Sequence, residues 1–89
     1  MTITEINFRM ASLDEPMLIA FASCVIDDML YINNIAIRKK YDGSIYLNFP
    51  RYTTRGGNEF PYYKPINREM YNEIKTALLN ALNIEGIQT

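Results

Sequence analysis

Few residues of this chain have the types and spacing that catalysis requires. The sequence has no histidine, so the commonest general base and metal ligand is missing. The one cysteine, Cys24, lies in the apolar run Met17–Ile26, which favours a small buried side chain over a nucleophile. Asp27 and Asp28 are an adjacent carboxylate pair, but neighbouring acids between two strands are typical of an exposed turn. We therefore expect no enzymatic activity, no metal, no cofactor and no small-molecule substrate, and we rank carboxylate chemistry at this pair last.

Charge is unevenly distributed along the chain. Between Arg38 and Arg68, seven basic residues stand against two acidic ones, Asp42 and Glu59, so this stretch has a net charge of +5. The rest of the chain has two basic and eight acidic residues, a net charge of −6. The overall charge of −1 therefore conceals a positive pole. The seven basic residues are Arg38, Lys39, Lys40, Arg51, Arg55, Lys64 and Arg68.

The basic stretch is also rich in aromatic residues, many of them in the segment Pro50–Pro65. Cations bind phosphates, and aromatic rings stack on bases, so the combination predicts a nucleic-acid-binding surface in this segment. Phosphate contacts carry little sequence information, and we expect modest specificity. The predicted phosphate contacts are Arg51, Arg55, Lys64 and Arg68, and the rings predicted to stack or pack are Tyr52, Tyr62 and Tyr63.

The same segment allows a second function. Exposed tyrosines and arginines are common anchors of protein interfaces, so a protein-interaction module that does not bind nucleic acid is the alternative hypothesis. In a purely structural alternative, Phe60, Tyr62 and Tyr63 pin the segment to a sheet or fill a dimer seam.

Three segments have the patterns of half-buried strands: Ile3–Met10, Leu30–Ile37 and Ser44–Phe49. Asp42-Gly43 predicts a hairpin before the last of them, with positive φ at both residues. Leu13–Pro16 and the turn at Asp27-Asp28 are expected to link strands. Pro50 ends the strand pattern, and the prolines and glycines that follow predict a long loop up to Pro65.

Met17–Ile26 has a different pattern from the other strands, because only Ser23 is polar. A strand that is apolar on both sides needs a cover on both sides. One helix covers one side, and a second subunit is the simplest cover for the other. We therefore expect a homodimer with an interface that includes Ile19, Phe21 and Val25.

A helix is expected from Arg68 onward, with Asn67 as its N-cap and Glu69 in its first turn. Asn83 and Gly86 are the expected stop signals. The apolar stripe consists of Met70, Ile74, Ala77, Leu78, Ala81 and Leu82. The predicted fold is a single α+β domain over residues 1–89, an antiparallel meander of four to five strands with one C-terminal helix packed on a face.

No segment of the sequence predicts a membrane span. The longest near-apolar run has ten residues, whereas a helix needs roughly 20 to cross a bilayer. Residues 1–5 lack the basic and apolar regions of a signal peptide. We expect a cytoplasmic protein with no membrane partner.

An ordered set of short motifs resembles the stage V sporulation protein G (SpoVG) family. The motifs are Ile26-Asp27-Asp28, Ile35-Ala36-Ile37, Asp42-Gly43, Phe49-Pro50, Thr54, Gly57 and Pro65-Ile66-Asn67, and their spacing agrees without gaps. The resemblance implies a small α+β fold that dimerises through its sheet. It also implies a bacterial regulatory protein that binds DNA or RNA and takes part in septation, cell division and sporulation.

The chain departs from the family pattern in the basic segment. The family has a basic pair directly before its threonine, and here these positions are Tyr52 and Thr53. Arg51 and Arg55 flank them and are the expected substitutes. Where the family often has an acid and a histidine before Pro-Ile, this chain has Pro61 and Lys64, so the segment is more basic and more aromatic.

Overall fold

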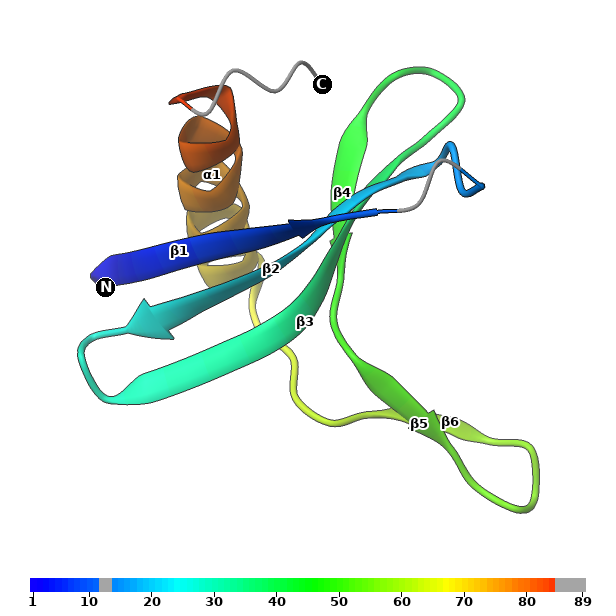
Figure 1. The fold of residues 1–89 in the computed structure, drawn as a ribbon. Helices are drawn as coiled ribbons and strands as arrows, with labels where there is room; N and C mark the ends of the chain where they lie inside the picture. The colour runs from blue at the N-terminus through cyan, green and yellow to red at the C-terminus, as the bar shows by residue number, and fades with distance from the viewer. Residues whose placement is uncertain (12–13, 85–89) are drawn as a thin grey trace.

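The computed structural model describes residues 1–11 and 14–84. The chain forms a four-stranded antiparallel sheet in the order β1-β2-β3-β4, a separate hairpin of β5 and β6, and a C-terminal helix (Figure 1). This confirms the α+β meander with its helix on one face, with four strands in the sheet. The elements are β1 (Ile3–Met10), β2 (Leu18–Ile26), β3 (Leu30–Lys39), β4 (Ile45–Asn48), β5 (Arg51–Thr53), β6 (Glu59–Pro61) and α1 (Arg68–Ile84).

The predicted segments agree with these elements except between Pro50 and Pro65. This segment is not a loop throughout, because it contains the two short strands of the β5–β6 hairpin. β3 also extends two residues beyond its predicted end at Ile37. Of the other predictions, Leu13 and Gly86 lie outside the described residues.

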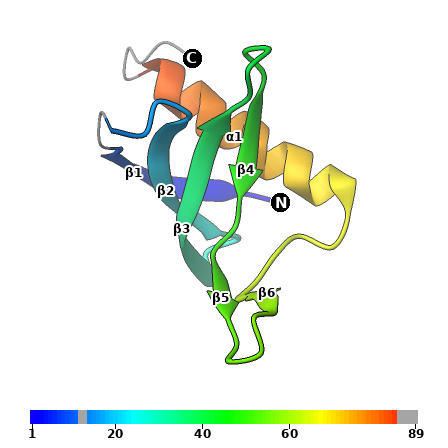
Figure 2. The ribbon, with the colours of Figure 1, turned by 90° about the vertical axis from the view of Figure 1, so that its right-hand side faces the viewer.

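The core lies between one face of the sheet and α1 (Figure 2). Ile74, Leu78 and Leu82 of the predicted helix stripe are almost completely buried there. The Asn67 side chain accepts a 2.7 Å hydrogen bond from the backbone N–H of Met70, which confirms the N-cap. Within residues 1–11 and 14–84, no helix has the length and apolarity needed to cross a membrane.

Two β-bulges keep apolar residues that are three apart on the same face. Glu5 has a φ of 49°, and the β1–β2 register shifts around it, so that Ile3 and Ile6 both pack against the core. Asn34 has a φ of 58° at a second shift, which allows Ile32 and Ile35 to be buried together. In a regular strand, one residue of each pair would point to the opposite face.

Two tight turns connect the strands of the meander. Asp27 and Asp28 have φ values of 52° and 55°, and the N–H of Met29 donates to the carbonyl of Ile26, so the predicted turn is a type I′ turn. The next hairpin is also present, but positive φ at both Asp42 and Gly43 was a wrong prediction. Only Gly43 has a positive φ, 90°, because the loop is a type I turn followed by a glycine bulge.

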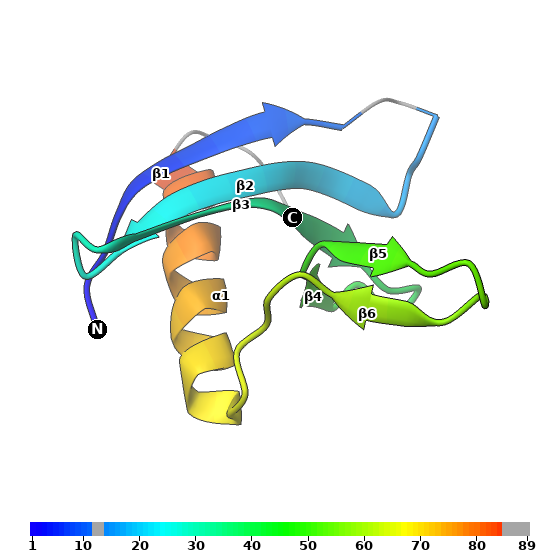
Figure 3. The same ribbon diagram turned by 90° about the horizontal axis from the view of Figure 1, so that it is seen from below.

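β2 alternates between two environments, as a strand in a two-layer structure must. From Ala20 to Ile26 its even-numbered residues are buried on the side of α1, and its odd-numbered ones are half-buried on the opposite face. A register shift between Leu18 and Ala20 ends this alternation, and Ile19 packs against the core. Figure 3 shows that α1 lies on one side of the curved sheet and that no element of the described chain covers the other. We call this uncovered side the open face.

Candidate nucleic-acid interface

The β5–β6 hairpin, which we call the arm, projects away from the sheet and the helix (Figures 1 and 3). Its strands pair Arg51 with Pro61, Tyr52 with Phe60 and Thr53 with Glu59. The turn resembles that of the β3–β4 hairpin: the N–H of Gly57, whose φ is 85°, donates to the Thr54 carbonyl. β5 is exposed along its whole length, and β6 is nearly so.

The foot of the arm is anchored to the folded body. The N–H of Tyr62 donates to the carbonyl of Pro50, which closes the hairpin. The hydroxyl of Tyr63 donates to the carbonyl of Asn33 on β3, and its ring packs edge-on against Phe49 at a centroid distance of 5.7 Å. Tyr63 is therefore placed for packing at the foot of the arm, and it is less available for stacking than the other predicted rings.

Tyr63 is expected to ionise late in an alkaline titration. Burial raises the pKa of its phenol to about 12, above the usual value near 10. The stability that the neutral phenol provides is therefore complete below about pH 10 and is lost as the pH rises through 12. Phenolate absorbance under conditions where circular dichroism shows an intact fold should reveal this late step. Tyr63→Phe should remove it, and a late step that survives in this variant would contradict the assignment.

Three aromatic rings lie together on one face of the arm. Tyr52 and Phe60 are cross-strand partners with centroids 5.9 Å apart, and Tyr62 lies 5.0 Å from Tyr52. The exposed fractions of Tyr52, Phe60 and Tyr62 are 43%, 46% and 68%. We call these three residues the aromatic ladder. Of the predicted stacking residues, the structure thus brings Tyr52 and Tyr62 together.

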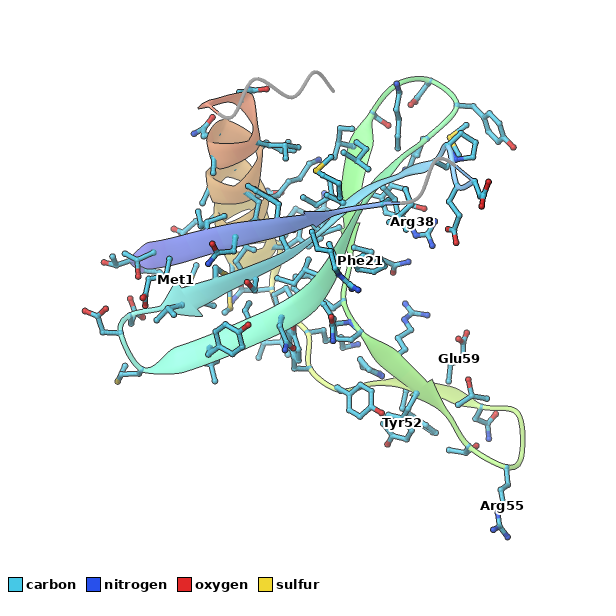
Figure 4. All side chains as sticks on the ribbon, in the orientation of Figure 1. Met1, Phe21, Arg38, Tyr52, Arg55 and Glu59 are labelled. Atoms are coloured by element: carbon cyan, nitrogen blue, oxygen red, sulfur yellow. The ribbon has the colours of Figure 1, made fainter. Side chains whose placement is uncertain are left out.

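Three of the four predicted phosphate contacts lie on the arm or at its foot, and the fourth, Arg68, lies at the start of α1. Arg51 and Lys64 line a cleft of about 390 Å³ together with Glu59, and Arg68 lines the neighbouring cleft. Arg55 lies at the tip of the arm (Figure 4). Among the residues that the structure describes, none of these four side chains makes a hydrogen bond or an ion pair. All four charges are therefore available to a ligand.

The other three basic residues lie elsewhere. Arg38, Lys39 and Lys40 lie at the end of β3 that leads into the β3–β4 turn, and Figure 4 places Arg38 far from Arg55. The ammonium group of Lys40 lies 5.6 Å from the centre of the Tyr46 ring, a cation–π distance. The positive stretch of the sequence is thus divided between two separate hairpins.

The residues that were candidates for catalysis have structural roles. Asp27 accepts a 2.7 Å hydrogen bond from the backbone N–H of Thr2 and joins the start of β1 to the β2–β3 turn. Cys24 is completely buried, and burial raises the pKa of its thiol, which disfavours the nucleophilic thiolate. Within the described residues, no three His, Cys, Asp or Glu side chains are grouped to hold a metal ion.

Two of the predicted dimer residues, Phe21 and Val25, lie on the open face, half-buried within the single chain. The third, Ile19, packs against the core, because the β2–β3 register shifts between Leu18 and Ala20. The guanidinium of Arg9 covers part of the open face, 4.7 Å from the centre of the Phe21 ring.

Phe60 is the member of the aromatic ladder that the sequence analysis did not assign to the site. A pattern for it exists in the sequence: Gly56-Gly57 is flanked by Tyr52 on one side and by Phe60 and Tyr62, two residues apart, on the other. Alternating aromatics around a glycine turn are typical of a hairpin with one aromatic face.

The comparison with known families covers nearly all of this architecture. A model of the SpoVG family matches residues 1–83 of the 89. A search of curated proteins found no matching sequence. The matched region contains the whole sheet, the arm and all but the last residue of α1. Together with the predicted resemblance, this match shows that the chain belongs to the SpoVG family.

Proposed function

We propose that this SpoVG family member is a non-enzymatic, cytoplasmic regulatory protein of bacteria that binds DNA or RNA through the arm. The observation that carries the proposal is the group of four unpaired cations around an exposed, projecting hairpin. The regulatory role in septation or sporulation rests on membership of the family, and the exposed, positively charged arm supports our choice of the binding surface.

The electrostatics of the arm suit a polyanion. Residues 50–68 contain four cations and one carboxylate, Glu59, so their net charge is +3. Binding a phosphate backbone releases condensed counterions, which provides a favourable free energy that depends on salt concentration. Arg55 at the tip and Lys64 at the foot are separated along the arm, so they would contact different phosphates of one strand.

A salt titration of the wild-type protein tests this function. If four phosphates are neutralised, the logarithm of the binding constant should fall against the logarithm of salt concentration with a slope of about −3 to −4. Fluorescence anisotropy with labelled DNA and RNA, each single-stranded and double-stranded, gives this slope. Absence of binding to all four ligands at low salt would contradict the proposal.

Protein interaction through the arm is the second candidate, and the exposed aromatic ladder favours it. Tyrosines with large exposed area are frequent hot spots of protein interfaces. The two functions differ in what the wild-type protein binds. The second function is supported over the first if the wild-type protein binds none of the four nucleic acids but does bind a partner protein. This binding should then depend on Tyr52 and Tyr62.

The quaternary structure that we propose is a homodimer formed by the open faces of two sheets. β2 presents Phe21 and Val25 there, and removing such apolar side chains from water against a second apolar surface is favourable. A second copy of the chain provides an identical apolar face, as two-fold symmetry requires. The dimer would carry two arms and therefore two groups of four cations.

A further inference from the structure

The aromatic ladder is too exposed to belong to the core of the protein. The aromatic residues that pack against the core are Phe8, Phe49, Tyr63 and Tyr71, and no ladder residue is among them. A cross-strand pair such as Tyr52 and Phe60 stabilises a hairpin modestly, but a third ring is not needed for this. Large apolar groups gathered at the surface of a small domain mark a binding surface.

The ladder and the cations occupy different sides of the same arm. Successive residues of a strand point to opposite faces, so Arg51 points away from the face that presents Tyr52. Arg51 instead lines the cleft with Glu59 and Lys64. Arg55 lies at the tip of the arm, beyond one end of the ladder, and Lys64 lines the same cleft as Arg51. A strand that crosses the ladder would therefore meet the rings first and positive charge at the tip and on the adjoining side of the arm.

We propose that the ladder stacks unpaired bases, so that the preferred ligand of the arm is a single-stranded nucleic acid. This rests on the proposed function and adds the class of nucleic acid. In a duplex, the flat faces of the bases are covered by neighbouring base pairs, and only an unpaired base can offer a face to Tyr52, Phe60 or Tyr62. A surface that bound duplex through its backbone would need the cations and would gain nothing from three exposed rings.

A cleft at the foot of the arm extends the ladder. It has a volume of about 400 Å³, within the usual range for small-ligand pockets, and Tyr62 lies at its border with the ladder. Asn33 and Asn34, both exposed on the bulge of β3, line the same cleft. Their amides can donate to and accept from the edge of a base that has left the stack. The cleft therefore provides room and hydrogen-bonding groups for a base next to Tyr62.

An abasic ligand separates stacking from phosphate binding in the wild-type protein. The probes are an oligothymidine strand, a strand of equal length made of abasic deoxyribose phosphates, and a duplex of that length, each at the same salt concentration. We expect the oligothymidine to bind tighter than the abasic strand by about 5- to 150-fold for each stacked base, and tighter than the duplex as well.

Each result of this comparison decides one of the two proposals. Equal binding of the oligothymidine and abasic strands would overturn stacking, leave phosphate binding intact and make the ladder a surface for a protein. Tighter binding of the duplex would also overturn the single-strand preference. Failure of all three probes to bind would overturn the stacking of bases in DNA, and the same failure with RNA strands in the salt titration would overturn the proposed function itself.

Tyr62→Leu tests the ladder directly. Leucine keeps an apolar side chain in place, and Tyr41→Leu on the β3–β4 turn is the matched control, since Tyr41 is 97% exposed. We expect Tyr62→Leu to weaken oligothymidine binding at least fivefold and to leave abasic-strand binding unchanged. Unchanged oligothymidine binding, or an equal loss with both strands, would overturn the proposal.

Discussion

Replacing both Arg51 and Arg55 by alanine is expected to weaken nucleic-acid binding by roughly 60-fold at about 0.05 M salt. Each phosphate contact that is lost should lower the binding constant for a single strand about 8-fold at this salt concentration. The reason is that counterion release makes each contact contribute a factor to the binding constant that varies with salt concentration to a power of about −0.7. The salt slope should become shallower by about 1.4 for the same reason. Fluorescence anisotropy over a range of salt concentrations measures both quantities.

The matched control removes two charges from the other basic hairpin. Lys39 and Lys40 are exposed and lie near the β3–β4 turn, away from the arm. Lys39→Ala with Lys40→Ala changes the net charge as much as the arginine variant does, so it reports the effect of overall charge alone. Equal losses in the two double variants would contradict the arm as the site, and circular dichroism would verify that both remain folded.

The sequence predicted the sheet well because local patterns determined it. The strict alternation of Ile6, Phe8 and Met10 indicated a strand, and Gly43 marked the following hairpin. The helix was equally clear, because Asn67 and the four-residue spacing of Ile74 and Leu78 supply a cap and a buried stripe within one segment. Features that depend on neighbours in sequence were therefore predictable.

The arm was missed because its local features conflict with a strand. Pro50 and Pro61 lack the N–H groups that a central strand needs, and each strand has only three residues. Pro61 is tolerated because a two-stranded hairpin has only edge strands. The turn of the arm repeats the chemistry of the turn at Gly43, with Gly57 at positive φ, so the pattern was present in the sequence.

The site was only partly predictable, because its composition is local and its geometry is not. The seven basic residues are close in sequence, but in the fold Lys39 and Lys40 lie at one hairpin and Arg55 lies at the tip of another. Likewise, only the long-range hydrogen bond from Tyr63 to Asn33 shows that this ring is held at the foot of the arm. Such separations arise from strand pairing between distant segments, which a motif does not specify.

The proposed dimer would present two arms on one particle. β2 exposes Phe21 and Val25 on a side that no described element covers, while its other side is buried under α1. If two copies join through this face, two arms are held in a fixed relation, and one long strand can engage both. Linking two weak sites in this way raises the overall affinity without a new contact. We therefore expect the proposed dimer to bind a long strand more tightly than a single arm would.

Phe21→Lys is expected to convert the dimer into monomers. The substitution places an amine beside Arg9, whose guanidinium lies over the Phe21 ring, so the two positive charges repel each other. A buried, unpaired charge costs about 3–5 kcal/mol, and symmetry places one on each side of the interface. The dissociation constant should therefore rise by at least about 10⁴-fold. Light scattering should change from about 21 kDa, twice the chain mass, to 10.4 kDa.

Tyr41→Lys is the matched control, because it makes the same aromatic-to-cation change at an exposed position on the β3–β4 turn. It should remain dimeric. If the wild-type protein already has the mass of one chain at micromolar concentration, the dimer proposal is wrong. If Phe21→Lys is monomeric and folded, its affinity for a short strand that fills one arm should be nearly unchanged. Its affinity for a strand long enough to reach two arms should fall, because only the dimer can engage such a strand twice.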